Sequence, residues 1–498
     1  GYQAFYNTGY YNADGEESNW KNNTLYIGNY LIEVNAQKLN NGILNGEIPS
    51  EYIIKPGTKT IADMAFTDCK GYIEYKDFEN CVGLTSIKLP DGMVNIGNGV
   101  FDGCTKLASI EIPKSVKNIG NSAFSGCISL TGINVSENNT AYCSENGVLY
   151  NKAKTEIMRF PCQKTDTSFT IPNGVTGIAN GAFENCRNLT GITIPKGAKS
   201  IGDDVFSNCE GLTSITIPDG VTSIGSGAFG GCTGLTEIAV DGNNPGYCAS
   251  DGVLFNKSKS QIIRYPGANG LNEYVIPDSV TNICIDAFDG CSGLTSVTIP
   301  DGVRSIGYGA FKGCSGLISV TIPDSVTTIG GEAFGFCREL KSINLGNGVT
   351  SIGSCAFRYC ESLTSITISD SVTSIEDYAF YSTSIKDVYY KGSENDRAKM
   401  DIAQSGNSSF LNATWHYNGD TTDPAVIEID VTIPDYQKGG TVMAALYDES
   451  DTLIGIKSYP PAETVKVSFE QSGAYIKVLQ WDMTTMKPLA PPQNIKVN

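Results

Sequence analysis

The chain has 498 residues, of which 40% are hydrophobic, and it contains 55 glycines and 20 prolines. This length exceeds one ordinary core, and apolar residues interrupted so often by glycine and proline indicate many short elements separated by turns. Its 53 acidic and 35 basic residues give a net charge of −18, which disfavours a nucleic-acid partner. No apolar run approaches the roughly 18 residues of a membrane span, so we expect no membrane insertion.

A 23-residue unit repeats along most of the chain. From Leu212 it reads L-T-S-I-x-I-P-x-x-V-x-x-I-G-x-x-A-F-x-x-C. The step within a set of units is 23 residues and the step between sets is 59, so 36 residues are inserted and a larger period of 105 results. The phenylalanine of the unit recurs at Phe78, Phe101, Phe124, Phe183, Phe206, Phe229, Phe288, Phe311, Phe334, Phe357 and Phe380.

The apolar positions of one unit are too few to close a core, so successive coils must stack on one another. The alternating run that ends at Ile217 predicts a short strand, and Pro218 ends it. A second short extended segment follows, and then one or two helical turns that carry Ala228 and Phe229. Coils stacked at strand spacing would form a body on the order of 70 Å long. Phe66 and Phe78 are only 12 residues apart, so one coil there is truncated or looped out.

The repeated motif A-F-x-x-C-x-x-L-x-x-I-x-I-P resembles the leucine-rich repeat of the BspA-like family of bacterial surface proteins. The resemblance covers roughly residues 1–418. It implies an α/β fold, a right-handed leucine-rich-repeat solenoid, in a protein that is secreted or displayed on the cell surface and linked to adhesion. We expect any signal peptide to lie outside this sequence, since the first residues match the second half of a unit.

Hairpin insertions are expected near residues 20–35, 134–162 and 239–267, where alternating apolar runs flank a polar turn. Such a hairpin either decorates and covers the side of the solenoid or forms a ridge that contacts a ligand. In the second interpretation the aromatic residues at loop tips are the binding candidates. These candidates are Tyr142, Tyr150, Phe160, Tyr247, Phe255 and Tyr265.

The repeat ends in an expected cap near residues 385–418, followed by a linker at 419–424. Strand-like runs at about ten-residue spacing predict a small all-β sandwich over residues 425–498. The end of this segment is similar to an accessory Ig-like module of clostridial-type surface proteins. Trp481 within it is a candidate stacking face for sugars, although a core position is the more common role of such a tryptophan.

The residue types of catalytic and metal sites are scarce in this sequence. Eleven of the 16 cysteines follow the repeat phenylalanine by three residues, which predicts a ladder of buried free thiols. Cys143 with Cys162 is the best disulfide candidate, and no C-x-x-C pair offers zinc spacing. His416 is the only histidine, and acidic turns such as residues 241–244 fit no EF-hand. We therefore expect no enzyme activity, no metal and no cofactor.

The sequence favours a cell-surface or secreted binding or adhesion protein that presents an extended face to a protein or glycan on a host or bacterial surface. An alternative is glycan or cell-wall binding by the C-terminal β-domain, with the solenoid as a spacer. A face poor in charge would bind by shape and hydrogen bonds over a wide area. Its expected residues are Thr213, Thr216, Thr295, Thr298, Thr321, Thr364 and Thr367.

Overall fold

The computed structural model describes residues 51–66 and 84–417, together with strands within residues 20–34 and 427–496. Most coils that the structure describes contribute one longer strand and one strand of two residues. The longer strands pair in parallel in sheets of four, four and seven strands, which we call the long-strand sheets. Equivalent residues 23 positions apart face each other, as Ile215 and Ile238 do. The predicted stacking of coils is confirmed.

The long-strand sheets contain β4 (Glu51–Ile53), β6 (Ser86–Lys88), β8 (Ser109–Ile112) and β10 (Gly132–Val135); β14 (Ser168–Thr170), β16 (Gly191–Thr193), β18 (Ser214–Ile217) and β20 (Glu237–Val240); and β24 (Glu273–Val275), β26 (Ser296–Thr298), β28 (Ser319–Thr321), β30 (Ser342–Asn344), β32 (Ser365–Ile368), β34 (Asp387–Tyr390) and β36 (Thr414–Tyr417).

The two-residue strands form the short-strand sheets. These contain β5 (Thr60–Ile61), β7 (Asn95–Ile96) and β9 (Asn118–Ile119); β15 (Gly177–Ile178), β17 (Ser200–Ile201) and β19 (Ser223–Ile224); and β25 (Asn282–Ile283), β27 (Ser305–Ile306), β29 (Thr328–Ile329), β31 (Ser351–Ile352), β33 (Ser374–Ile375) and β35 (Asp401–Ile402).

A three-stranded antiparallel insertion begins each short-strand sheet and divides the solenoid into three blocks. Its last strand pairs in parallel with the first two-residue strand of the block, as β13 does with β15. The insertions are β1 (Trp20–Lys21), β2 (Thr24–Ile27) and β3 (Tyr30–Val34); β11 (Tyr142–Glu145), β12 (Val148–Asn151) and β13 (Glu156–Arg159); and β21 (Tyr247–Ser250), β22 (Val253–Asn256) and β23 (Gln261–Arg264). We call the junctions at β11–β13 and β21–β23 the first and second corners.

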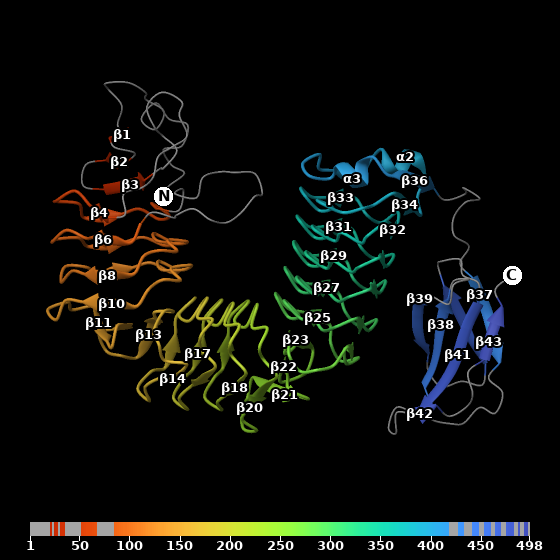
Figure 1. Cartoon of the computed structure of the whole chain (residues 1–498), viewed down its shortest axis with the longest axis horizontal. Coiled ribbons are helices and arrows are strands. Elements are labelled where there is room, and N and C mark those ends of the chain that lie inside the picture. Colours follow the sequence, from red (N-terminus) through yellow and green to blue (C-terminus); the bar gives the residue numbers. More distant parts are fainter. Residues whose placement is uncertain are drawn as a thin grey trace.

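The solenoid changes direction at both corners (Figure 1). Each block has its own hydrophobic core, and the hairpin strand between two blocks contributes to both. Leu149 packs into the core of the first block, whereas Val148 and Tyr150 pack into the core of the second. Because side chains alternate along a strand, one hairpin can close two cores at once.

Inside each block the repeat phenylalanines stack. The rings of Phe311, Phe334 and Phe357 lie 5.2 and 5.4 Å apart at interplanar angles of 7° and 3°. At the irregular first junction it is Phe66 that packs on Phe101, with the ring centroids 5.5 Å apart and the rings tilted by 35°. Phe78, predicted as a ladder residue, lies outside the described residues.

The helical turns that motivated the α/β class are absent from the repeat units that the structure describes. The residue before each Ala-Phe pair takes a left-handed conformation, such as Asp286 at φ 54° and Glu332 at φ 54°. A further left-handed residue follows two positions after the phenylalanine, for example Gly290 at φ 74°. Too few right-handed residues remain between them for an α-helical turn, so the described repeats form a β-solenoid.

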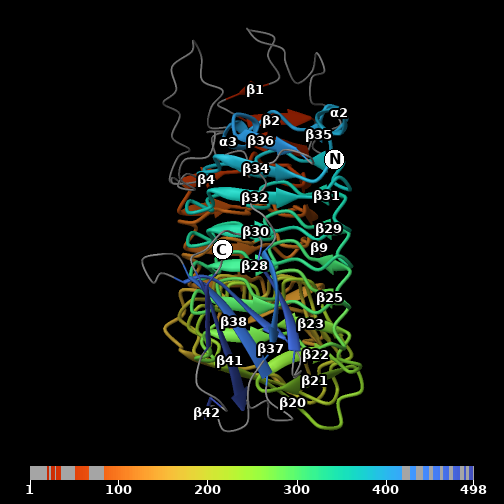
Figure 2. The same ribbon diagram turned by 90° about the vertical axis from the view of Figure 1, so that its right-hand side faces the viewer.

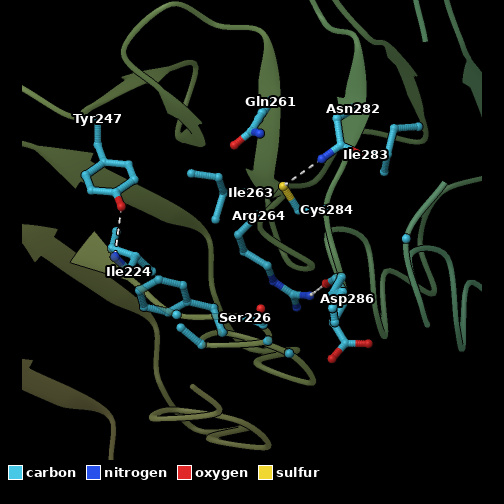
Figure 3. A pocket seen from close by; sticks show the side chains of 17 residues that line it. Ile224, Ser226, Tyr247, Gln261, Ile263, Arg264, Asn282, Ile283, Cys284 and Asp286 are labelled. Atoms are coloured by element: carbon cyan, nitrogen blue, oxygen red, sulfur yellow. Dashed lines mark hydrogen bonds between the residues drawn. The ribbon is translucent and has the colours of Figure 1, made fainter. Parts of the chain in front are cut away.

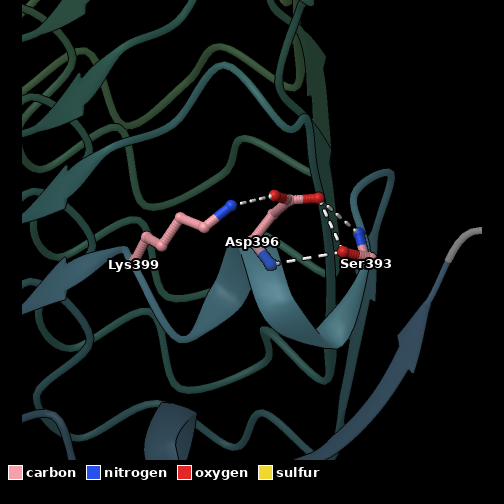
Figure 4. A network of polar contacts seen from close by, with 3 residues as sticks. All are labelled: Ser393, Asp396 and Lys399. Atoms are coloured by element: carbon pink, nitrogen blue, oxygen red, sulfur yellow. Dashed lines mark hydrogen bonds and ion pairs between the residues drawn. The ribbon is translucent and has the colours of Figure 1, made fainter.

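The C-terminal cap contains the two helices of the described residues, α2 (Glu394–Arg397) and α3 (Ser408–Leu411). α3 places Phe410 on Phe380 at 4.4 Å, which extends the aromatic ladder by one rung. α2 begins at a capping box in which Ser393 and Asp396 bond reciprocally, and Lys399 pairs with Asp396 at 2.9 Å (Figure 4). These bonds hold the pKa of Asp396 at about 2.

Beyond residue 426 the described elements are antiparallel strands in two sheets. β37 (Ile427–Thr432) pairs with β40 (Thr464–Phe469). β38 (Thr441–Tyr447) lies between β39 (Leu453–Tyr459) and β41 (Tyr475–Asp482), and β41 also pairs with β42 (Lys487–Pro488) and β43 (Gln493–Lys496). The Ig-like module stays a prediction for this segment.

Candidate functional site

The long-strand sheet of the third block presents an uncharged polar surface along four consecutive strands. Alternation buries Val297 and Val320 and turns Thr298 and Thr321 outward. Figure 2 shows the strands from β28 to β36 stacked one above the other. The outward positions of β26, β28, β30 and β32, which we call the hydroxyl strip, are Ser296, Thr298, Ser319, Thr321, Ser342, Asn344, Ser365 and Thr367.

The threonines predicted to form this face fall into two groups. Thr216, Thr298, Thr321 and Thr367 lie at outward positions of strands, as expected. Thr213, Thr295 and Thr364 precede the strands. The hydroxyls of Thr213 and Thr295 donate to the carbonyl oxygens of Thr190 at 3.2 Å and Asn272 at 3.1 Å in the preceding coil. Those two hydroxyls hold coils together.

An aromatic pair lies on the cap beyond the hydroxyl strip. The rings of Tyr389 in β34 and His416 in β36 stack at 4.7 Å with an interplanar angle of 15°. Nε2 of His416 lies 2.9 Å from Oδ1 of Asp387, on the same strand as Tyr389. Both rings are half-buried. The only histidine of the chain therefore lies at the end of the long-strand sheet, beyond the hydroxyl strip.

The hairpin aromatics predicted as binding residues lie in the core rather than at exposed tips. Tyr142, Tyr150, Phe160, Phe255 and Tyr265 are buried, and Tyr247 is half-buried. The expectation of exposed loop-tip aromatics is therefore wrong for the first five, because both faces of the hairpin are covered by neighbouring blocks. Trp481 lies in β41 opposite Thr441, and its side chain is outside the described residues.

One tyrosine and one asparagine fasten each corner hairpin to the preceding block. The hydroxyl oxygen of Tyr247 accepts a hydrogen bond from the N–H of Ile224, in the last strand of a short-strand sheet. The amide of buried Asn244 donates to the carbonyl oxygens of Pro218 at 2.7 Å and Val221 at 2.9 Å. Its Oδ1 accepts from the N–H groups of Gly246 and Tyr247. The acidic turn around it is thus built about a structural amide.

A buried arginine ends the last strand of the insertion at each corner. Arg264 donates to the carbonyl oxygen of Cys232 at 3.4 Å in the second block and to those of Asp286 at 2.7 Å and Asp289 at 2.9 Å in the third. It therefore joins two blocks across the second corner. Arg159, its counterpart at the first corner, donates to the carbonyl oxygens of Gly181 and Glu184. Neither arginine was predicted from the repeat motif, although each ends an apolar strand.

The predicted bridge between Cys143 and Cys162 is not formed. The thiol of Cys143 donates to the carbonyl oxygen of Asn151 at 3.4 Å, and that of Cys162 donates to the carbonyl oxygen of Glu184 at 3.2 Å. The two thiols donate to different acceptors, so we no longer assign this disulfide.

The ladder cysteines from Cys127 onward have thiols that bond to the coil before them. Cys337 donates to the carbonyl oxygen of Phe311 at 3.2 Å, and Cys360 donates to that of Phe334 at 3.1 Å. Burial raises the pKa of both thiols, so they stay protonated and inert at neutral pH. The ladder contributes hydrogen bonds as well as apolar packing.

A partly open cavity of about 350 Å³ lies at the second corner, between the end of the second block and the start of the third (Figure 3). Phe229 and Ile224 form one side, and Ile263, Arg264 and Asp286 form another. The equivalent cavity at the first corner measures about 30 Å³.

In the part of the chain that the structure describes, no group of three or more His, Cys, Asp or Glu side chains could hold a metal ion. Within the same residues, no helix is long and apolar enough to cross a membrane. The surface features that remain for function are the hydroxyl strip, its aromatic end and the second-corner cavity.

The coil geometry defines a leucine-rich-repeat solenoid. The model of the BspA type Leucine rich repeat region matches residues 71–166, 155–248 and 264–386. These ranges cover more than half of the chain, and the protein therefore belongs to this family. The resemblance inferred from the repeated motif is confirmed. No curated protein matches the chain.

Solved structures of several other proteins are similar to this chain. A leucine rich cell surface protein from Faecalibacterium prausnitzii is 29% identical, with 78% of this chain and 98% of that chain covered and a TM-score of 0.49. A leucine-rich repeat protein from Eubacterium ventriosum is 26% identical over 68% and 77% of the two chains, with a TM-score of 0.35. The pneumococcal vaccine antigen PcpA is 18% identical over 80% and 97%, with a TM-score of 0.42. Membership of the family rests on the match to the family model and not on the similarity to these structures.

Proposed function

We propose that this protein is a non-enzymatic binding or adhesion protein of the cell surface or the extracellular space. Its hydroxyl strip is the contact surface for a protein or glycan partner. Membership of the BspA-type family, together with similarity to a leucine rich cell surface protein and to a vaccine antigen, supports this location and role.

One observation carries the proposal: the hydroxyl strip is uncharged in a chain whose net charge is −18. Charged residues occupy outward positions at its two ends, Glu273 in β24 and Asp387 in β34, but none of its own eight positions. A sheet face lined with hydroxyl groups offers many hydrogen bonds over a wide area, without long-range attraction to a charged partner. The stacked rings of Tyr389 and His416 extend this surface with an aromatic platform.

Two exposed positions of the strip test the proposal. Thr298→Lys with Thr321→Lys places two charges on the strip without touching the core. Binding of the full chain is measured on an array of host and bacterial surface proteins and on a glycan array. We expect binding to fall at least tenfold. The matched control is Thr170→Lys with Thr193→Lys on the second block, which should bind as the parent does.

The alternative assigns glycan or cell-wall binding to residues 425–498 and treats the solenoid as a spacer. Unchanged binding by the Thr298→Lys, Thr321→Lys variant, with loss of binding after removal of residues 419–498, would favour that alternative. Circular dichroism shows whether the solenoid is still folded in each variant.

A further inference from the structure

The two corners have the same framework but differ in the space that they enclose. Each contains the tyrosine that fastens the hairpin, the buried arginine and the end of a short-strand sheet. The cavity volume is nevertheless about 350 Å³ at the second corner and about 30 Å³ at the first. A volume of about 350 Å³ lies at the lower end of the range for small-molecule sites, whereas about 30 Å³ holds a water molecule.

Small side chains open the second corner. Met158, Ser122 and Ser125 line the first-corner cavity, and Ile263, Gly227 and Gly230 occupy the equivalent positions 105 residues later. At the first corner Oγ of Ser125 donates to Oε2 of Glu184 at 2.5 Å, which ties the two blocks together across the gap. Gly230 has no side chain with which to make this bond.

The second corner also gains a carboxylate. Asp286 lines its cavity where the first corner has Gly181. Its carboxylate lies beside Gly230, since a Cβ atom built there would be 2.9 Å from Oδ2. Among the described residues this carboxylate has no hydrogen-bond or ion-pair partner. The neighbouring cation Lys312 pairs with Glu332 at 2.6 Å instead.

Charge at this site favours a cation over an anion. The guanidinium of Arg264 is engaged by three backbone carbonyl oxygens, and Asp204 and Asp289 add two more carboxylates around Asp286. Burial and the neighbouring Asp289 raise the pKa of Asp286 to about 7, and Lys312 and Arg264 oppose this shift. A bound cation would stabilise the ionised form of Asp286.

The rim of the cavity is apolar. Ile285 lines the cavity and is 39% exposed, and Tyr308 in the next coil is 48% exposed. The equivalent positions of earlier coils hold polar residues that bond between coils: Asn180 Oδ1 accepts from the N–H of Asp203 at 2.9 Å, and Asp203 Oδ1 accepts from the N–H of Ser226 at 2.8 Å. The first two coils of the third block replace this ladder by exposed apolar surface beside the cavity.

We propose that the second-corner cavity binds an organic cation, an alkylammonium or alkylguanidinium whose aliphatic part lies on Ile263 and Ile285 and whose charged head contacts the carboxylate of Asp286. The cation comes either from a free amine or from a lysine or arginine side chain of a polypeptide. The cavity is separate from the hydroxyl strip, so this proposal does not depend on the function assigned to that surface.

The probes are 1,5-diaminopentane and Nα-acetyl-lysine methylamide, titrated into the full chain at pH 8 and followed by calorimetry. Nα-acetyl-norleucine methylamide is the uncharged control. We expect saturable binding of the two amines at least tenfold tighter than that of the norleucine compound, and at least tenfold weaker amine binding at pH 5, where Asp286 is protonated. Tighter binding of the diamine identifies a free amine as the source, and tighter binding of the lysine compound identifies a polypeptide.

Two variants test separately the contribution of the charge and that of the cavity volume. Asp286→Asn removes the charge and should weaken amine binding at least tenfold while removing most of its pH dependence. The combination Gly230→Ser, Ile263→Met and Asp286→Gly installs three residues of the first corner and should abolish binding. Glu111→Gln, an exposed position on the first block, is the control that should bind as the parent does.

The proposal fails if neither amine binds saturably at pH 8, if the norleucine compound binds as tightly as the lysine compound, or if Asp286→Asn binds the amines as the parent does. Circular dichroism establishes that each variant is folded. If the triple variant does not fold, Asp286→Asn and the pH comparison decide the question.

Discussion

The phenolic oxygen of Tyr247 accepts a 2.8 Å hydrogen bond from the backbone N–H of Ile224. Ile224 belongs to β19, the last strand of a short-strand sheet, where the next coil would otherwise supply an acceptor. Tyr142 repeats the relationship with Ile119 in β9, also at 2.8 Å. At each corner a tyrosine hydroxyl of the hairpin thus accepts the hydrogen bond from the edge-strand N–H, because the insertion interrupts the sheet there.

Tyr247→Phe should therefore destabilise the solenoid by about 1–2 kcal/mol, because it leaves a partly buried N–H without an acceptor and changes little else. Tyr142→Phe should have a similar effect at the first corner. Urea unfolding followed by circular dichroism measures both. If both variants unfold at the urea concentration of the parent, the hydroxyl oxygen is not the effective acceptor.

Asn244→Ala should have a larger effect, roughly 3 kcal/mol, because two carbonyl oxygens and two N–H groups lose their partner together. Asn243→Ala, one residue earlier and exposed, is the matched control and should be within about 0.5 kcal/mol of the parent. The same urea unfolding experiment measures both variants. Equal effects at the two positions would contradict the role assigned to the buried amide.

Asp286 predicts a dependence of stability on pH. Its pKa is raised to about 7 in the folded protein from an ordinary value of 3.8, so the folded state holds a proton that the unfolded state has lost. The contribution of Asp286 to the free energy of unfolding is thus complete below about pH 4 and declines as the pH rises to about 7. The shift corresponds to at most about 4 kcal/mol, and solvent screening at this partly exposed site lowers the expectation to roughly 1–2 kcal/mol.

Asp286→Asn should accordingly be more stable than the parent above pH 7 and should show less change between pH 4.5 and 8.5. Urea midpoints across this range measure the difference. The variant Asp301→Asn, at an exposed turn, controls for the general loss of one negative charge. Parallel pH profiles for Asp286→Asn and the parent would show that Asp286 ionises normally.

Thiol reactivity distinguishes the ladder from the hairpins. Cys337 and Cys360 are buried with raised pKa values, so iodoacetamide should leave them unmodified in the native protein at pH 8. The half-buried Cys143 and Cys248 should react at least tenfold faster. Peptide mass spectrometry after timed alkylation measures each site, and full reaction in urea is the control. Equal rates at all four sites would contradict the packing of the ladder.

The repeat unit was predictable because its physical requirements are local and recur. Leu212, Ile215, Ile217 and Phe229 occupy spacings that only stacked coils can bury, and the structure places all four in one core. The backbone conformation at the Ala-Phe pair was not predictable in this way, and the helical turns expected there are absent from the described repeats. Left-handed residues on both sides of that pair decide its conformation, and they include Asp286, Glu332 and Tyr359 as well as glycines, so no residue type identifies them.

The sequence by itself determined the 23-residue coil, its 105-residue super-unit and the positions of the hairpins, because these follow from apolar spacing along the chain. Only the tertiary structure decided what the hairpins do. Leu149 and Tyr150 are neighbours in sequence yet enter the cores of different blocks, which buries the aromatics that had suggested a binding ridge. The cavity at Asp286 and the edge closure by Tyr247 likewise depend on residues of two blocks meeting in space, and such contacts have no signature in local spacing.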